Sequence, residues 1–285
     1  MAEKTKPETI NRYFIQLNYK GTRYHGWQIQ ENANSVQAEL NQKLSLMLGE
    51  TIETTGAGRT DTGVHALYYI AHFDSANLER IAAQFTLKNP WGKDAYQVFV
   101  QKLNGFLSPD IAVQQIFKMH PNAHARFDAL SRTYEYHITR FKNPFLNDYA
   151  YYLRGKLDVE LMNRMARELF SYQDFKSFSK TDSGNHTSLC TISRAEWEEK
   201  DDLLVFTIKA NRFLRNMVRA IVGTLLDAGT GKINRADFKN IIEGKDRRLA
   251  GTSVPAKGLF LTFIEYPQKF NLFPLSSDEN QVSEQ

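Results

Sequence analysis

The stretch TTGAGRTDTGVHALYYIAHF, residues 54–73, decides how the first half of the chain folds. Glycines at positions 56, 58 and 63 surround an Arg-Thr-Asp triplet, and the residues from Val64 onward alternate in the manner of a strand. A phosphate-binding P-loop ends in Gly-Lys-Ser or Gly-Lys-Thr and continues into a helix, and this stretch does neither. It therefore predicts a tight loop followed by a strand, and it disfavours nucleotide binding by the loop.

The residues on either side of this loop predict further strands and helices. Ser35 is expected to cap a helix that ends at Gly49 and carries apolar side chains on one face, at positions 36, 40, 44 and 48. Residues 196–211 are typical of a hairpin with its turn at 200–202. The remaining strands are expected at 12–19, 66–74, 111–119, 131–140 and 258–266. The remaining helices are expected at 78–85, 98–107, 159–170 and 212–229.

Both halves of the chain mix strands with helices and combine hairpins with crossover connections. This pattern favours an α+β architecture in which two similar sheet-and-helix lobes meet at a central sheet. The lobes are expected to divide near residues 120–125, where HPNAHARF interrupts regular structure. The predicted divisions are a flexible arm at 1–10, an N-terminal lobe with the glycine-rich loop at 11–120, a C-terminal lobe at 121–268 and a polar tail at 269–285.

The composition is that of a globular protein whose charge must be clustered locally if it binds a polyanion. Of 285 residues, 42% are hydrophobic and 24% charged, and the net charge is only +4, so the protein as a whole has no strong field. A local basic cluster is present in Arg212, Arg215 and Arg219. No apolar run approaches the roughly 20 residues of a membrane helix, and the N-terminus lacks an apolar signal core. We expect a cytoplasmic protein without a membrane partner.

Metal and thiol chemistry have little support in the sequence. Cys190 is the only cysteine, which excludes an internal disulfide and indicates a reducing compartment. No glycine elbow surrounds it, so we expect a buried, unreactive thiol. His120 and His124 are four residues apart, but Pro121 disfavours the helix that would place them on one face. We therefore expect no metal site, and histidines with structural or surface roles.

Asp61 is the strongest candidate for chemistry. The neighbouring glycines allow backbone conformations that other residues avoid, and they let a ligand approach closely. Arg59 lies two residues away, and an adjacent guanidinium would favour the charged, acceptor-only carboxylate, which can act as a base or as a nucleophile. The alternative is a turn aspartate that bonds to its own backbone, which is common in such loops.

Six stretches within residues 12–267 share the motifs of one enzyme family. They are LNYKGTRYHGWQIQ, SVQAEL, GAGRTDTGVHA followed by AHF, HARFDALSRTYEY, NRFLRNMVRAIVGTLLDAGTGK and GTSVPAKGLFL. In this order the chain closely resembles the TruA-type tRNA pseudouridine synthases. Thr62 departs from the usual alanine, LYYIAHF lacks the usual Gly-Gln pair, and residues 84–100 form a longer stretch than is typical, either a loop at the RNA-facing rim or an idle surface insertion.

The resemblance implies a fold, a reaction and partners. The fold is the pseudouridine synthase fold: two ferredoxin-like lobes that share one central, mostly antiparallel sheet with a positive cleft. The reaction is the isomerisation of uridine to pseudouridine in the anticodon arm of tRNA, at positions 38 to 40, with no cofactor. The family also forms homodimers, so a second copy of the chain is an expected partner.

The resemblance also assigns roles to single residues. Asp61 matches the catalytic aspartate and Arg59 an active-site arginine that occupies the vacated base position or binds a phosphate. Tyr134 matches the residue that stacks on the target base, and Leu259 an apolar residue that packs under the uracil. The alternatives are a surface charge for Arg59 and ordinary core positions for Tyr134 and Leu259.

The basic cluster completes the predicted site. On the helix expected at 212–229, Arg212, Arg215 and Arg219 fall on one face at spacings of three and four residues. We expect Arg219 to point inward and pair with Asp61, and Arg212 and Arg215 to bind phosphates, unless this face is simply solvated. Two other function classes stay open: a tRNA-binding protein that has kept the fold without the chemistry, and a nucleotide-binding protein.

Overall fold

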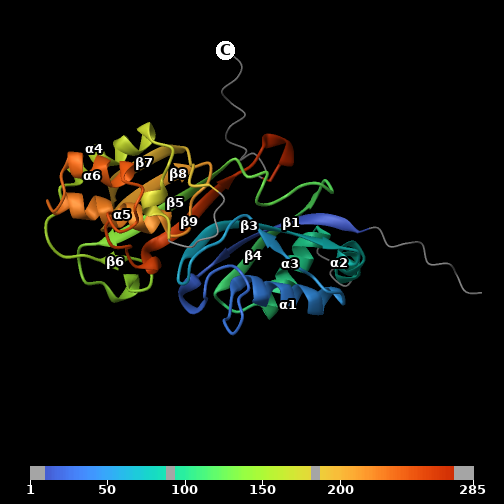
Figure 1. Ribbon diagram of the computed structural model, residues 1–285. Coiled ribbons are helices and arrows are strands. Elements are labelled where there is room, and N and C mark those ends of the chain that lie inside the picture. The colour runs from blue at the N-terminus through green and yellow to red at the C-terminus, as the bar shows by residue number, and fades with distance from the viewer. Residues whose placement is uncertain (1–9, 88–93, 181–186, 273–285) are drawn as a thin grey trace, which may run out of the picture.

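The computed structural model describes residues 10–87, 94–180 and 187–272 (Figure 1). Residues 1–9 of the predicted arm, 273–285 of the predicted tail and 88–93 of the long stretch at 84–100 lie outside the described residues. The strands are β1 (Asn11–Tyr19), β2 (Thr55–Gly56), β3 (His65–Ser75), β4 (Ile111–Met119), β5 (Ser131–Thr139), β6 (Tyr151–Tyr152), β7 (Ile192–Lys200), β8 (Leu203–Ala210) and β9 (Leu259–Glu265). The α-helices are α1 (Val36–Leu48), α2 (Leu78–Leu87), α3 (Ala95–Phe106), α4 (Val159–Glu168), α5 (Met217–Gly229) and α6 (Arg235–Glu243).

A single mixed sheet organises the described part of the chain. Its order is β4-β1-β3-β9-β5-β8-β7, with β2 beside β3 and β6 beside β5. Six of its eight strand pairings are antiparallel, and only β3 with β9 and β5 with β6 run parallel. The last strand, β9, lies between β3 and β5, where Phe260 pairs with His65 and Leu259 with Tyr136. The C-terminal strand therefore joins the two halves of the chain into one sheet, and the predicted mostly antiparallel α+β architecture is confirmed.

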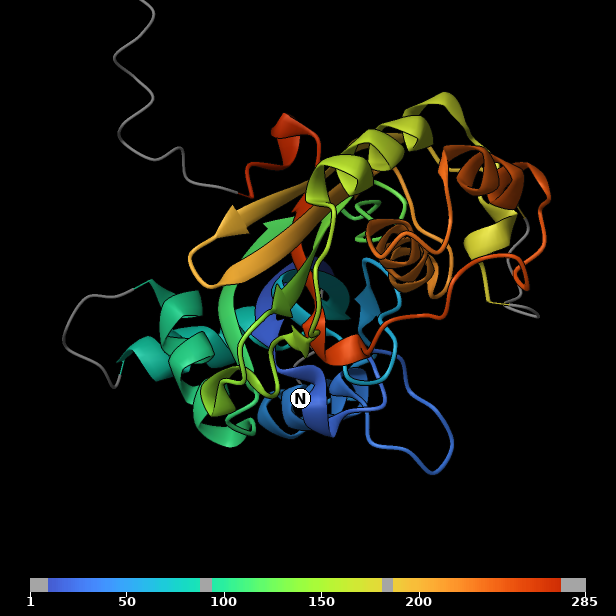
Figure 2. The same cartoon turned by 90° about the vertical axis from the view of Figure 1, so that its left-hand side faces the viewer.

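Two clusters of buried side chains correspond to the two halves of the sheet. The first packs α1, α2 and α3 against β1, β3 and β4, and the second packs α4, α5 and α6 against β5, β7 and β8. Figures 1 and 2 show these two groups of helices at opposite ends of the molecule. Strand β9 contributes to both clusters, through Leu261 to the first and Leu259 to the second. The ferredoxin-like character of each half stays a prediction.

The helix α1 shows how local signals set an element. Ser35 has an extended backbone, and its hydroxyl accepts a hydrogen bond from the backbone N–H of Ala38. Gly49 ends the helix in the left-handed conformation, with φ of +64°. The apolar stripe at positions 36, 40, 44 and 48 is buried in the first cluster. The prediction for this helix is confirmed at both ends.

The helix predicted at 212–229 is wrong at its start. It begins at Met217, because Asn216 adopts the left-handed conformation with φ of +66° and interrupts the helical hydrogen-bond pattern. Arg212 and Arg215 therefore lie on an irregular segment before α5 and do not share a helix face with Arg219. Helix α6 was not predicted, although Asn234 and Asp237 form a reciprocal capping box at its N-terminus. Within the described ranges, no helix has the length and apolar character needed to cross a membrane.

Candidate active site

The loop between β2 and β3 places Asp61 between the two halves of the sheet. At its start, the Ala57 N–H donates to the Ile70 carbonyl, 2.9 Å away, which continues the pairing of β2 with β3. At its end, the Val64 N–H donates to the Asp61 carbonyl at 3.1 Å and closes a turn. Gly63 makes this turn with φ of +80°, a conformation that favours glycine. The predicted tight loop followed by a strand is confirmed.

The segment that follows β1 packs directly against this loop at Gly26. A Cβ atom on Gly26 would lie 2.2 Å from the Thr60 carbonyl oxygen, so only glycine allows the two backbones to come this close. The hydroxyl groups of Tyr19 and Thr60 share a hydrogen bond of 2.8 Å, and the Tyr69 hydroxyl donates to the Gly58 carbonyl. These contacts fix the backbone on both sides of Arg59 and leave little freedom for the residue that follows Thr60.

Two arginines flank the Asp61 carboxylate. Arg219 Nη1 lies 3.5 Å from Asp61 Oδ2, and Arg215 Nε lies 3.9 Å from Oδ1. Arg219 is also held by the segment that precedes β9, because its Nε donates to the Val254 carbonyl at 2.7 Å. The side chains of Asp61 and Arg219 are 24% and 21% exposed, so the pair is recessed but still open to a ligand, whereas Arg215 is 49% exposed. The predicted contact of Arg219 with Asp61 is confirmed, and the approach of Arg215 to Asp61 was not anticipated.

Tyr134 lies on β5 close to this ion-pair cluster. Burial raises the pKa of Tyr134 to about 12, with a smaller contribution in the same direction from the Asp61 carboxylate. The Phe213 ring meets the Tyr134 ring edge to face, with the centroids 5.1 Å apart. In the sheet, Tyr134 pairs with Leu261 on one side and Ile208 on the other. The phenol is therefore a neutral ring held firmly beside the carboxylate.

The other predicted site residues are less closely gathered. Arg59 is exposed and, within the described part of the chain, has no hydrogen bond or ion pair, so the guanidinium groups near Asp61 belong to α5 and the segment before it. Arg212 is half-buried and lies near the Cys190 thiol rather than in an ion pair with any described carboxylate. Leu259 is 5% exposed and belongs to the second hydrophobic cluster, a core position.

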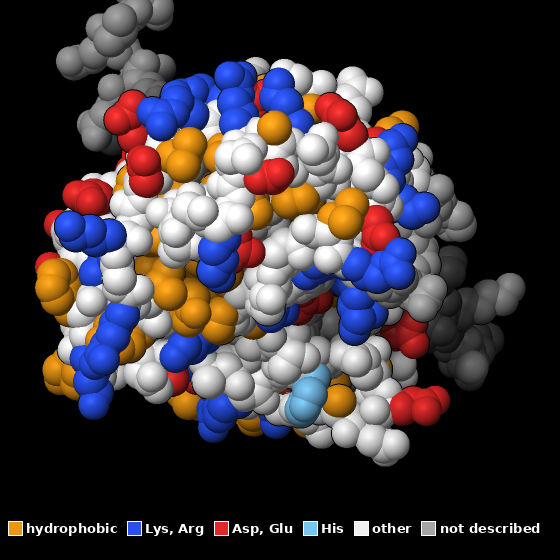
Figure 3. Space-filling view, turned by 60° about the vertical axis from the view of Figure 1, so that its left-hand side comes forward, with side chains coloured by type: hydrophobic (Ala, Val, Ile, Leu, Met, Phe, Trp, Pro, Cys, Tyr) orange, Lys and Arg blue, Asp and Glu red, His pale blue; other side chains and the backbone are white. Residues whose placement is uncertain are grey.

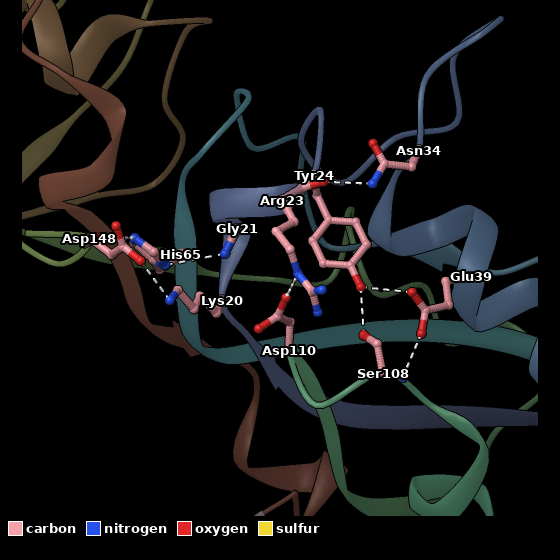
Figure 4. A network of polar contacts seen from close by, with 10 residues as sticks. All are labelled: Lys20, Gly21, Arg23, Tyr24, Asn34, Glu39, His65, Ser108, Asp110 and Asp148. Carbon is pink, nitrogen blue, oxygen red and sulfur yellow. Dashed lines mark hydrogen bonds and ion pairs between the residues drawn. The ribbon is translucent and has the colours of Figure 1, made fainter.

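A polar network ties the segment that follows β1 to both halves of the molecule (Figure 4). His65 Nδ1 accepts from the Gly21 N–H at 3.1 Å, and Nε2 donates to the Asp148 carbonyl at 3.0 Å. The ring is therefore neutral with its proton on Nε2, and burial lowers the pKa of His65. Lys20 Nζ pairs with Asp148 Oδ2 at 2.8 Å. Sequence reasoning missed this network, because none of these residues is close to its partner along the chain.

The charge on one face of the molecule agrees with a polyanionic ligand. Figure 3 shows Lys and Arg side chains bordering a hollow on that face, with acidic side chains recessed in it and at its edge. A carboxylate that is flanked by guanidinium groups and lies beside a buried aromatic ring can act on a nucleotide, while the cations bind the phosphates on either side of that nucleotide. Among the described residues there is no group of three or more His, Cys, Asp or Glu side chains placed to hold a metal ion.

Comparison with known proteins gives the family. A sequence model described as tRNA pseudouridine synthase matches residues 165–267. The chain is 50% identical to tRNA pseudouridine synthase A of Bacteroides thetaiotaomicron over 262 residues, 91% of this chain and 92% of that protein. It is 47% identical to tRNA pseudouridine synthase A of Parabacteroides distasonis over 266 residues (93% and 99%), and 38% identical to that of Exiguobacterium sp. over 257 residues (90% and 98%). Because these matches cover nearly the whole of both chains and include the Asp61 loop, the chain belongs to the tRNA pseudouridine synthase A family.

Proposed function

We propose that this chain isomerises uridine to pseudouridine at positions 38 to 40 of the anticodon arm of tRNA, with Asp61 as the catalytic carboxylate. The observation that supports this most directly is the recessed Asp61 side chain, held 3.5 Å from Arg219 on a loop fixed at both ends. The anticodon arm and the tRNA positions follow from the resemblance of the six motifs.

The reaction makes simple demands on the protein. The bond between N1 of the base and C1′ of the ribose breaks, the uracil turns, and a bond forms between C5 and C1′ as C5 loses a proton and N1 gains one. The atoms are conserved, so the reaction consumes no reductant or energy-rich substrate. It requires an oxygen base or nucleophile and a nucleotide taken out of its stack. Asp61 supplies the oxygen, acting on the sugar or on the base.

The residues around Asp61 then have separate tasks. Tyr134 stacks on the extruded base, a contact that contributes about 1–3 kcal/mol in single-stranded RNA recognition. Arg219 orients the carboxylate, and Leu259 lines the floor on which the uracil turns. Arg212 and Arg215 contact phosphates of the RNA. Arg59 contacts a phosphate or occupies the space that the flipped base leaves. The exposed, unpaired state of Arg59 among the described residues leaves its guanidinium free for this role.

The proposal is tested by substitution of the carboxylate. Asp61→Asn keeps the shape of the side chain and removes its charge, and purified protein is incubated with unmodified tRNA transcripts before pseudouridine is mapped chemically. We expect loss of product with tRNA binding retained. The matched control is Asp74→Asn, which removes the charge of a carboxylate paired with Arg12 at 2.7 Å near the C-terminal end of β3. Product formation by Asp61→Asn at the rate of the control would refute the assigned role.

The same experiment tests one of the two other function classes, a protein that binds tRNA without modifying it. A protein that only binds tRNA would retain the transcript but form no pseudouridine, in the unaltered chain as well as in the variant. The two ferredoxin-like lobes and the homodimer are part of the same proposal. Light scattering of the full chain at micromolar concentration tests the dimer, and a mass of 32.8 kDa would contradict it.

A further inference from the structure

Arg132 has an unusual set of partners. It lies on β5, two residues before Tyr134, and its terminal nitrogens donate four hydrogen bonds, all to backbone carbonyls. Nη1 donates to the carbonyls of Ala129 (3.0 Å) and Asn211 (3.0 Å), and Nη2 to those of Ala57 (2.8 Å) and Arg126 (2.8 Å). No carboxylate in the described part of the chain forms an ion pair with it. One guanidinium therefore joins three segments that are far apart in the sequence.

The environment of this guanidinium gives a physical reason to look for a role. Burial lowers the pKa of Arg132 from its usual value, so the surroundings disfavour its charge. A partly buried charge without a counter-ion destabilises a protein unless its donors are satisfied. Here the rigid fork of donors matches carbonyls that point inward from different segments, a pattern that a flexible ammonium cannot reproduce. Apolar packing would fill this space with less desolvation, but it would not fix the positions of four carbonyl oxygens.

Two of these four carbonyls belong to the segments that carry the proposed catalytic groups. Ala57 lies four residues before Asp61, on the loop after β2. Asn211 lies four residues before Arg215, on the irregular segment that leads into α5. These segments come from opposite halves of the sheet, and the distance between them sets the distance between the carboxylate and the guanidinium groups.

The same face of β5 contacts a third part of the site. Side chains two residues apart on a strand point to the same face, so Arg132, Tyr134 and Tyr136 form a row. The Tyr136 hydroxyl donates to the Pro255 carbonyl at 2.8 Å, and the preceding carbonyl, that of Val254, holds Arg219 Nε. Strand β5, which carries Tyr134, therefore also holds three backbone segments of the site. Arg132 binds the carbonyls of Ala57 and Asn211, and Tyr136 binds that of Pro255.

We propose that Arg132 is a positioning residue for this active site: its guanidinium fixes the Asp61 loop relative to the segment that carries Arg215 and Arg219. This inference rests on the proposed role of Asp61. It assigns Arg132 no contact with the substrate. Its function is to hold the carboxylate at the distance from the arginines and from Tyr134 at which the reaction proceeds.

Substitution of the guanidinium tests this proposal. Arg132→Met removes the fork and keeps an extended side chain, and Arg132→Lys keeps the charge without the fork. The single-turnover rate of pseudouridine formation at saturating tRNA transcript, the dissociation constant for the transcript and the melting temperature are measured for each. Because a misplacement of about 1 Å at a reacting group lowers a rate by about 100-fold, we expect a rate loss of that order in both variants, with unchanged tRNA affinity.

Arg12→Met is the matched control. The Arg12 guanidinium also donates to a carbonyl, that of Ala123 at 3.0 Å, and it pairs with Asp74, but neither partner touches the site. Rates for the Arg132 variants equal to the control's would overturn the proposal. It would equally be overturned if affinity or melting temperature fell in proportion to the rate, since that would indicate general support of the fold. If Arg132→Met does not fold, Arg132→Lys decides alone. Failure of the unaltered protein to form pseudouridine would instead refute the proposed function.

Discussion

Gly26 offers a sharp test of how closely the Asp61 loop depends on the segment that follows β1. In Gly26→Ala the new Cβ would meet the Thr60 carbonyl oxygen at 2.2 Å, whereas real Cβ contacts essentially never fall under 3.0 Å. The loop or its support must therefore move by at least ~0.8 Å, directly beside Asp61. The substitution also places a side chain at φ of +90°, and a left-handed residue is destabilised by roughly 1–2 kcal/mol.

The expected result separates these two effects. The backbone penalty alone would lower the free energy of unfolding by roughly 1–2 kcal/mol and leave the chemistry intact. A shift of the loop approaching 1 Å would in addition lower the single-turnover rate of pseudouridine formation by about 100-fold. We therefore expect the free energy of unfolding of Gly26→Ala to fall by more than the backbone penalty, because the contact with Thr60 adds to it. We also expect the variant to lose most of its activity.

The chain contains a matched control for this experiment. Gly49, at the C-terminus of α1, has φ of +64°, but a Cβ placed there meets no atom within 4 Å. Gly49→Ala should therefore show only the backbone penalty, with full activity. Stability is measured by denaturant unfolding and activity by single-turnover assay on the same tRNA transcript. If Gly26→Ala and Gly49→Ala were indistinguishable in both measurements, the close packing of Gly26 on Thr60 would have no functional consequence and the reasoning would fail.

Two further predictions concern titration and reactivity. Burial, followed by the charge of Arg12, lowers the pKa of His72 from 6.5 to about 4, so the native state binds fewer protons than the unfolded state between these pH values. The free energy of unfolding should therefore fall as the pH drops from 6.5 to 4. It should fall less steeply in His72→Asn, whose side-chain oxygen can still accept a hydrogen bond from the Ala125 N–H. Equal dependence of the unfolding free energy on pH in the two proteins, measured by urea unfolding, would contradict this. Burial raises the pKa of Cys190 to about 11, so its thiol should resist iodoacetamide at pH 8 in the native protein and react once urea unfolds it, as mass spectrometry would show; rapid native labelling would be inconsistent with this environment.

Much of the secondary structure follows from short-range signals in the sequence. Helix α1 is predicted at both ends, because a cap at Ser35, an apolar stripe and a glycine at position 49 are all local. The hairpin of β7 and β8 and the strand β5 are predicted for the same reason, since alternation is visible within a few residues. The capping box of α6 was equally local, and the pattern from Asn234 to Asp237 could have indicated that helix.

The composition of the site is harder to obtain from the sequence. Periodicity placed Arg212 and Arg215 on a helix, but Asn216 adopts a left-handed backbone that no spacing rule reveals. The nearest arginine in the sequence, Arg59, is exposed, and the carboxylate is instead approached by Arg219 from a distance of 158 residues along the chain. Proximity along the sequence was therefore a poor guide to which charge lies beside Asp61, whereas the pairing of Arg219 with Asp61 was correctly predicted.

The sequence by itself determined most of the elements, the α+β class and, through six ordered motifs, the family. The elements depend on caps and on side-chain periodicity, which neighbouring residues specify, and the motifs are short stretches that can be read directly from the sequence. Only the tertiary structure decided that β9 inserts between β3 and β5, that the Arg132 guanidinium joins Ala57 to Asn211, and that Arg215 approaches Asp61. The physical reason is that burial and long-range pairing, summed over the whole sheet, choose which distant segments meet, and no local pattern contains that sum.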